Sequence, residues 1–168
     1  ESHGRDNCGG LMGLTVDATT RTLTSSCRSG PMWYTDQYRF AGTKLYLYRS
    51  EEVLRLGDAL DAALQWEQTD EQGPLAVWRT HDATGRVLDS AIADGLSGPG
   101  SGEPLRGQQA TVVPARLFLF DRPGAASTKR YLVQGDRVEM LDERDGWVKV
   151  RYRNPKQGAV EGWINVND

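Results

Sequence analysis

The chain has 168 residues, with 20 lysines and arginines against 23 aspartates and glutamates, so its formal net charge is −3. Because the basic residues are scattered rather than clustered, nucleic acid and anionic membrane surfaces are not expected as its main partners. No run approaches 18 apolar residues, so no membrane span is expected. A chain of this length can form one or two small domains.

The N-terminal part predicts short strands joined by tight turns. Residues 17–25 recur in a similar form as residues 82–90, and each copy begins with Asp-Ala-Thr. A run that favours strand precedes and follows each turn, and we expect Asp17 and Asp82 to accept backbone N–H bonds there. Two such copies predict an antiparallel β-meander over residues 1–94.

A further hairpin is expected between the copies, where residues 33–40 and 44–49 alternate around a glycine-containing turn. Strand alternation places Tyr34, Tyr38 and Phe40 on one face, which is the predicted core face.

Residues 50–68 fit two structures. Their apolar positions could form one amphipathic helix, but Gly57 and several alanines weaken it. The neighbouring hairpins favour a loop that leads into a strand at residues 62–69.

Residues 95–107 are rich in glycine, proline and serine, which is typical of a linker. We therefore place a domain boundary near residue 100, with a second domain over residues 108–168.

The C-terminal part predicts a small β-barrel. Short alternating runs occupy residues 137–141, 147–152 and 159–166, and turn residues separate them. With the apolar stretch 110–120 they make four or five strands, and no segment between them has helical periodicity. Because so small a β unit must hide its edges, a compact SH3-like barrel is expected. The predicted fold class is mainly β: a meander domain followed by this barrel.

Four motifs in this part resemble the bacterial SH3 domain (SH3b), and they follow one another in the order expected for that family. They lie at residues 117–123, at Tyr131-Leu132-Val133-Gln134-Gly135-Asp136-Arg137-Val138, at residues 146–150 and at Glu161-Gly162-Trp163-Ile164. The resemblance implies an exported bacterial protein, and some members of the family bind cell-wall peptides whereas others bind proteins. In an exported chain, Cys8 and Cys27 are expected to form a disulfide, the alternative being two free or buried thiols. A periplasmic location, with or without a lipid anchor on a segment outside this sequence, fits the same inference.

The first forty or so residues after the N-terminus carry a second resemblance. The motifs Leu14-Thr15-Val16-Asp17, residues 21–26, Trp33-Tyr34-Thr35-Asp36-Gln37-Tyr38-Arg39-Phe40 and residues 44–47 are similar to the terminal hairpin repeat of periplasmic immunity proteins and lysozyme inhibitors. That likeness implies a protein partner, namely a peptidoglycan-cleaving effector delivered by rival bacteria.

An enzyme is not expected. Cys8 and His81 are the one pair that could serve a cysteine peptidase, but no helix is predicted at Cys8 to lower the pKa of its thiol, and a disulfide would remove the nucleophile. The acidic residues lie in polar turns, where solvated carboxylates are the usual explanation. No cysteine or histidine pair has zinc spacing, and no calcium loop or phosphate loop is present, so neither a metal nor another cofactor is expected.

Aromatic residues and one arginine are the candidate partner-binding residues, because Trp, Tyr and Arg carry much of the energy of protein interfaces. Trp147 and Trp163 also fit the core or the rim of the barrel, and Arg28 also fits a solvated turn; for these three the structural alternative is the preferred one. The full set is Arg28, Trp33, Tyr46, Tyr48, Trp66, Trp78, Trp147 and Trp163.

Three functions follow from these observations, in order of preference. The first is an immunity or inhibitor protein that occludes the cleft of a peptidoglycan hydrolase. The second is a module that recognises peptidoglycan stem peptide, and the third is a cysteine cell-wall hydrolase.

Overall fold

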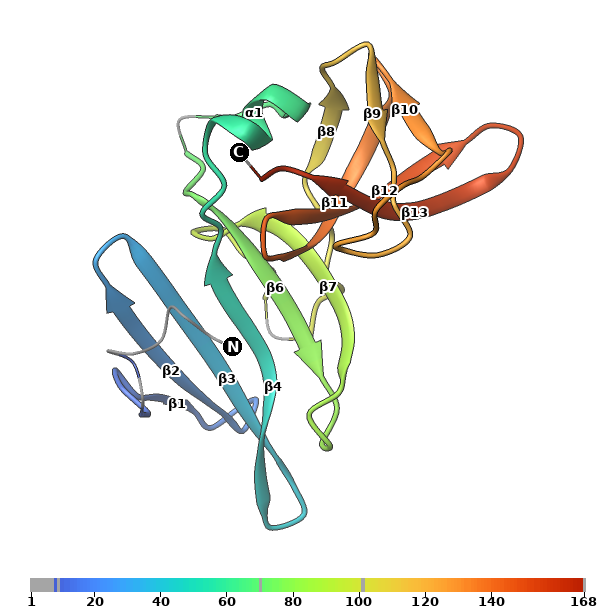
Figure 1. Ribbon diagram of the computed structural model, residues 1–168. Helices are drawn as coiled ribbons and strands as arrows, with labels where there is room; N and C mark the ends of the chain where they lie inside the picture. The colour runs from blue at the N-terminus through green and yellow to red at the C-terminus, as the bar shows by residue number, and fades with distance from the viewer. Residues whose placement is uncertain (1–7, 9, 70, 101, 168) are drawn as a thin grey trace.

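The computed structural model describes residues 8, 10–69, 71–100 and 102–167, and it confirms a mainly β protein built from antiparallel sheets. The larger sheet has six strands in the order β1-β2-β3-β4-β6-β7, drawn from blue to light green in Figure 1. These strands are β1 (Thr15–Asp17), β2 (Thr22–Ser29), β3 (Met32–Ala41), β4 (Lys44–Val53), β6 (Leu75–His81) and β7 (Val87–Asp94).

The two expected Asp turns are confirmed. Asp17 Oδ1 accepts hydrogen bonds from the backbone N–H groups of Thr19 at 2.8 Å and Thr20 at 3.2 Å. Asp82 Oδ1 accepts them from Thr84 at 2.9 Å and Arg86 at 3.1 Å. Each carboxylate thus fixes the turn of a hairpin, β1–β2 in the first copy and β6–β7 in the second.

The C-terminal part is barrel-like. A five-stranded sheet has the order β13-β12-β11-β8-β5, and β9 pairs with β10 as a separate ribbon. A bridge between Phe120 and Trp163 joins the region after β9 to β13. The strands of this part are β5 (Leu64–Gln65), β8 (Gln109–Val112), β9 (Arg116–Phe118), β10 (Tyr131–Val133), β11 (Arg137–Arg144), β12 (Trp147–Asn154) and β13 (Gly158–Asn165).

The hairpin β11–β12 turns at Asp145 and Gly146, with φ values of 50° and 77°. Positive φ at both positions is what a two-residue hairpin turn requires, and it explains why a glycine follows an aspartate here.

Of the strand expected at residues 62–69, only residues 64–65 form a strand; a short helix ends at residue 63, and residues 66–69 are irregular. Helix α1 (Asp58–Ala63) leads directly into β5 (Leu64–Gln65), a two-residue strand that pairs with β8. Leu60 and Ala63 are buried, and their i, i+3 spacing turns them to one side of the helix; Leu64, the first residue of β5, is buried beside them. Burial of these three side chains outweighs the weak helix propensity of the segment.

One hydrophobic core runs through both parts of the chain. Val77 and Ile92 of the six-stranded sheet belong to the same buried cluster as Leu64, Val138 and Ile164. The core therefore lies where the barrel-like part packs against β6 and β7, at the upper right of Figure 1.

The segment expected to be a linker is held against the six-stranded sheet. The guanidinium of the buried Arg49 donates hydrogen bonds to the carbonyl oxygens of Pro99 at 3.0 Å, Gly100 at 2.5 Å and Glu103 at 2.6 Å. Gly98 packs on the indole of Trp78 so closely that a Cβ atom would lie 1.9 Å from a ring carbon. Backbone carbonyls and a glycine thus fix this segment in place.

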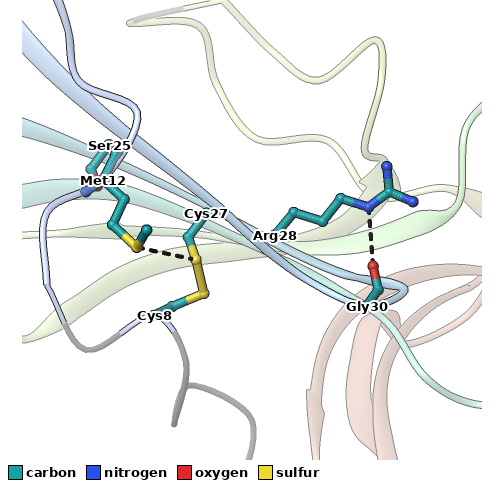
Figure 2. The surroundings of a disulfide bond; sticks show 6 residues. All are labelled: Cys8, Met12, Ser25, Cys27, Arg28 and Gly30. Atoms are coloured by element: carbon teal, nitrogen blue, oxygen red, sulfur yellow. Dashed lines mark hydrogen bonds between the residues drawn. A yellow bond between two sulfur atoms is a disulfide. The ribbon is translucent and has the colours of Figure 1, made fainter.

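The predicted disulfide between Cys8 and Cys27 is present, and it ties the N-terminal segment to β2 (Figure 2). Met12 lies in that segment with its Sδ 3.9 Å from the Sγ of Cys27, and its carbonyl accepts a hydrogen bond from the backbone N–H of Ser26. Among the described residues, no helix has the length and apolar character needed to cross a bilayer.

The predicted core face of β3 is only partly buried. Tyr34 is buried, Tyr38 is half-buried and Phe40 is exposed. The barrel-like part packs against β6 and β7, and it leaves the far end of β3 open.

Candidate partner-binding face

One face of β2, β3 and β4 gathers arginines and aromatic rings. Residues directly opposite one another in an antiparallel sheet share a face, and the register pairs Arg28 with Trp33 and Arg39 with Tyr46. Trp33 and Arg39 lie six residues apart on β3, so they share that face. We call this surface the cationic face, and it consists of Arg28, Trp33, Arg39, Tyr46 and Tyr48; Arg49 lies on the same side of the sheet but is buried beneath residues 99, 100 and 103.

A β-bulge in β4 brings Tyr48 and Arg49 together on this side of the sheet. Gln37 pairs with Arg49 and the next residue of β3 pairs with Leu47, so Tyr48 has no opposite partner. In a regular strand Tyr48 and Arg49 would point to opposite faces. The ring of Tyr48 instead lies 5.6 Å from the guanidinium carbon of Arg49.

Aromatic stacking holds the cations in position. The guanidinium carbon of Arg39 lies 3.7 Å from the centre of the Tyr48 ring, and that of Arg28 lies 5.4 Å from the Trp33 ring. Arg28 Nε also donates a hydrogen bond to the Gly30 carbonyl at 3.0 Å, within the β2–β3 turn (Figure 2). A cation fixed in this way loses less conformational entropy when a partner binds it.

Two polar atoms on the same side of β3 are buried without a hydrogen-bond partner in the described part of the chain, namely Trp33 Nε1 and Gln37 Oε1. Buried polar groups are nearly always satisfied in folded proteins, and each exception costs free energy. These two atoms therefore mark a surface whose hydrogen bonding is incomplete.

The inner end of the face carries a buried acid. The pKa of Glu51 is raised to about 7. Burial is the largest cause, a hydrogen bond with Thr35 acts in the opposite direction, and the nearby carboxylate of Asp94 raises the pKa as well. Among the described residues of β2, β3 and β4, Glu51 is the one acid whose register places it on this face. The outer part of the face is thus positively charged.

The structure brings five of the eight predicted residues to one face and separates the other three. Arg28, Trp33, Tyr46 and Tyr48 lie on the cationic face, and Trp78 pairs with Glu51 on the same side of the sheet, buried beneath Gly98.

The other three tryptophans belong to the barrel-like part or its border. Trp66 is half-buried beside a pocket of about 340 Å³ that Leu64 and Val113 also line. Trp147 packs edge to face on Phe120 with ring centres 5.2 Å apart, and the buried Trp163 lies under the Arg144 guanidinium at 5.3 Å.

The sequence did not single out Arg39, or the buried Arg49 on the same side of the sheet. Strict alternation along β4 places Arg49 on the side opposite to Tyr46 and Tyr48, and only the bulge reverses this. The sequence also did not single out the exposed ring pair Phe118 and Tyr131 on the β9–β10 ribbon, because buried and exposed aromatic residues cannot be told apart within short apolar runs.

The arrangement offers binding groups rather than a reaction centre. Cys8 is bonded to Cys27, so its sulfur is not a thiolate nucleophile in this state. Within the part of the chain that the structure describes, no group of three or more His, Cys, Asp or Glu side chains is placed to hold a metal ion. Comparison of the chain with protein-family models, curated proteins and solved structures gives no match in any of the three.

Proposed function

We propose that the protein is an exported inhibitor, an immunity protein of bacterial antagonism, whose cationic face occludes the cleft of a peptidoglycan-cleaving enzyme. The observation that carries the proposal is the stacking of Arg28 on Trp33 and of Arg39 on Tyr48 on one face of one sheet. Enzymes that cleave glycosidic bonds hold paired carboxylates in their clefts, so fixed cations are complementary to them.

The shape of the face suits an elongated cleft. Trp33 and Arg39 are six residues apart on β3, which at the rise of an extended strand is about 20 Å. Arg28 lies opposite Trp33, so the two cations Arg28 and Arg39 have a similar spacing. A paired β-sheet holds that spacing rigidly, so both cations can contact the cleft without reordering of the backbone. Inhibition on this account is steric, with the arginines providing attraction and orientation.

The proposed location rests on two observations. The Cys8–Cys27 disulfide is the kind of bond that persists in oxidising compartments such as the periplasm. The SH3b resemblance of residues 117–164 supports a bacterial cell-envelope protein.

The test is an inhibition assay with the peptidoglycan hydrolase encoded next to this protein. We expect the wild-type chain to stop its lysis of purified cell walls, and the double variant Arg28→Glu/Arg39→Glu to inhibit at least about 100-fold more weakly. Arg55→Glu, an exposed charge reversal in the loop after β4, is the matched control and should inhibit like the wild type. Full inhibition by the double variant, or no inhibition by the wild type, would overturn the proposal.

Recognition of peptidoglycan itself is the second candidate, and one observation favours it. Phe118 and Tyr131 face each other across the β9–β10 ribbon, each is 48% exposed, and Arg116 lies 4.4 Å from the Tyr131 ring. Such a platform could bind a stem peptide through its carboxylates and apolar groups. This function requires the chain alone to sediment with insoluble peptidoglycan, and Phe118→Ser/Tyr131→Ser to remain in solution.

A further inference from the structure

The opposite face of β1 to β4 carries a continuous row of apolar side chains. The register pairs Val16 with Leu23, Leu23 with Tyr38, and Tyr38 with Leu47, so these four side chains cross four strands on one face. Phe40 and Leu45 pair in the next row on that face, two residues along β3 and β4. We call these six residues the apolar stripe: Val16, Leu23, Tyr38, Phe40, Leu45 and Leu47.

Half of the stripe is exposed to solvent, and Leu23, Tyr38 and Leu47 are half-buried. Val16 is 75% exposed, Phe40 54% and Leu45 39%. The barrel-like part covers Val77 and Ile92 on β6 and β7. The β3–β4 turn, and the start of β2 beside it, extend away from that part in Figure 1. Contiguous apolar surface of this kind is uncommon on a monomeric protein and marks an interaction site.

Charge restricts what can cover the stripe. None of its six side chains carries a charge, and alternation turns Asp17 and Lys44, at the ends of β1 and β4, to the other face. Asp36 shares the face of the stripe in the next row of β3, and its side chain is half-buried. A partner that placed an ionised group on the stripe would bury that group unpaired, at a cost of several kcal/mol. The occupant therefore presents an uncharged apolar surface, unlike the acidic cleft proposed for the cationic face.

The stripe is self-complementary when two copies of the chain are related by a twofold axis. A twofold axis parallel to the strands, between β2 and β3, lays β1 of one copy over β4 of the other and β2 over β3. Val16 then meets Leu47 and Leu23 meets Tyr38, each contact occurring twice. A smaller side chain opposes a larger one each time, which allows two sheets to pack about 10 Å apart.

Arg21 is the cation nearest the stripe, in the turn before β2. The same axis brings it over the Phe40 end of β3 in the second copy, where an aromatic ring accommodates a guanidinium. We infer that the apolar stripe is the interface of a twofold dimer of this chain, with sheet packed on sheet. Both cationic faces of such a dimer point outward, so each copy remains free to bind a hydrolase.

The experiment is the mass of the intact, disulfide-bonded chain by sedimentation equilibrium between about 1 µM and 1 mM. We expect the wild type to reach twice the 18.6 kDa of one chain, and Phe40→Glu and Leu45→Glu to weaken dimerisation at least about 100-fold. Leu88→Glu, on an exposed leucine of β7, is the matched control and should remain dimeric. Thermal unfolding of each variant verifies that it is folded.

Two results would overturn the inference: a wild type that stays monomeric over the whole range, or a folded Phe40→Glu that still dimerises. If the wild type is monomeric and Phe40→Glu loses hydrolase inhibition, the stripe docks the hydrolase instead, which also refutes the dimer. A monomeric Phe40→Glu that inhibits normally supports the dimer and leaves the function of the cationic face intact.

Discussion

Arg79 and Asp142 form an ion pair that ties the two large sheets together. Arg79 on β6 donates hydrogen bonds from Nε at 3.1 Å and from Nη2 at 2.8 Å to the same carboxylate oxygen of Asp142 on β11. Nη2 also donates to the Glu143 carbonyl at 3.0 Å. The Asp142 side chain is 3% exposed, and its charge is compensated by Arg79 at 2.8 Å and, at its other oxygen, by the more exposed Arg144 at 3.3 Å.

Loss of this pair is expected to be costly. Arg79→Leu should lower the free energy of unfolding by about 2 to 4 kcal/mol, because it leaves the buried carboxylate with one longer ion pair, to the exposed Arg144. Arg86→Leu, which removes the exposed ion pair with Asp82, should cost less than about 0.5 kcal/mol. Urea unfolding of both variants measures the difference, and equal costs would show that the Arg79 pair is not a tie between the sheets.

Arg49 is expected to control the segment that joins the two parts of the chain. Arg49→Met keeps the apolar stem but removes the donors to three carbonyls, so we expect a loss of about 2 to 3 kcal/mol. Trypsin should also cleave after the exposed Arg106, in the same segment, faster than in the wild type. In the matched variant Arg55→Met, on an exposed arginine, the cleavage rate should not change. Unchanged cleavage in Arg49→Met would show that the Arg49 hydrogen bonds do not hold this segment against the sheet.

Glu51 should make stability depend on pH near neutrality. Its pKa rises from 4.5 to about 7 on burial, so the folded chain holds this proton more tightly than the unfolded chain. The stabilising contribution is complete below pH 4.5 and is lost as pH rises through about 7. Glu51→Gln, which never ionises, should be about 1 to 2 kcal/mol more stable than the wild type at pH 8 and similar to it at pH 4.

The measurement for Glu51 is the urea midpoint of the wild type and of Glu51→Gln across that pH range. Glu67→Gln, on an exposed loop residue, serves as the control. A constant difference between Glu51→Gln and the wild type at every pH would show that Glu51 does not titrate there.

Reduction of the disulfide should destabilise the six-stranded sheet. Cys8 and Cys27 are 19 residues apart, and closing a loop of that size removes enough unfolded-state entropy to contribute about 3 kcal/mol. The double variant Cys8→Ser/Cys27→Ser should therefore unfold at lower urea concentration. Dithiothreitol should shift the wild type to the same midpoint and leave the variant unchanged, and a wild type insensitive to reductant would refute this.

Local features could be predicted from the sequence because neighbouring residues determine them. Asp17 and Asp82 cap their own turns, and Asp145-Gly146 has the conformational preference that a two-residue hairpin needs. The face occupied by Trp33 follows from simple alternation along β3.

Features that depend on distant partners could not be predicted. The buried role of Arg49 needs carbonyls some fifty positions away, in a segment whose composition is typical of a flexible linker. Helix α1 has six residues, which is too short to form on its own propensity, and it exists because Leu60 and Leu64 join a core supplied by β8 and β11. The face that Arg49 occupies depends on a bulge at Tyr48 that no local sequence motif predicts.

Bulges give three strands one residue more than their pairing uses: Tyr48 in β4, Leu88 in β7 and Leu141 in β11. A strand with a surplus residue can be shortened by one without turning its remaining side chains over, whereas the same deletion within β3 would exchange its two faces. Deletion of Tyr48 would keep Leu47 on the apolar stripe and remove the ring beneath Arg39. Length variation in descendants of this chain is thus expected to be tolerated best at Tyr48 and Leu88, because Leu141 is buried, and in β4 it would change binding while sparing the fold.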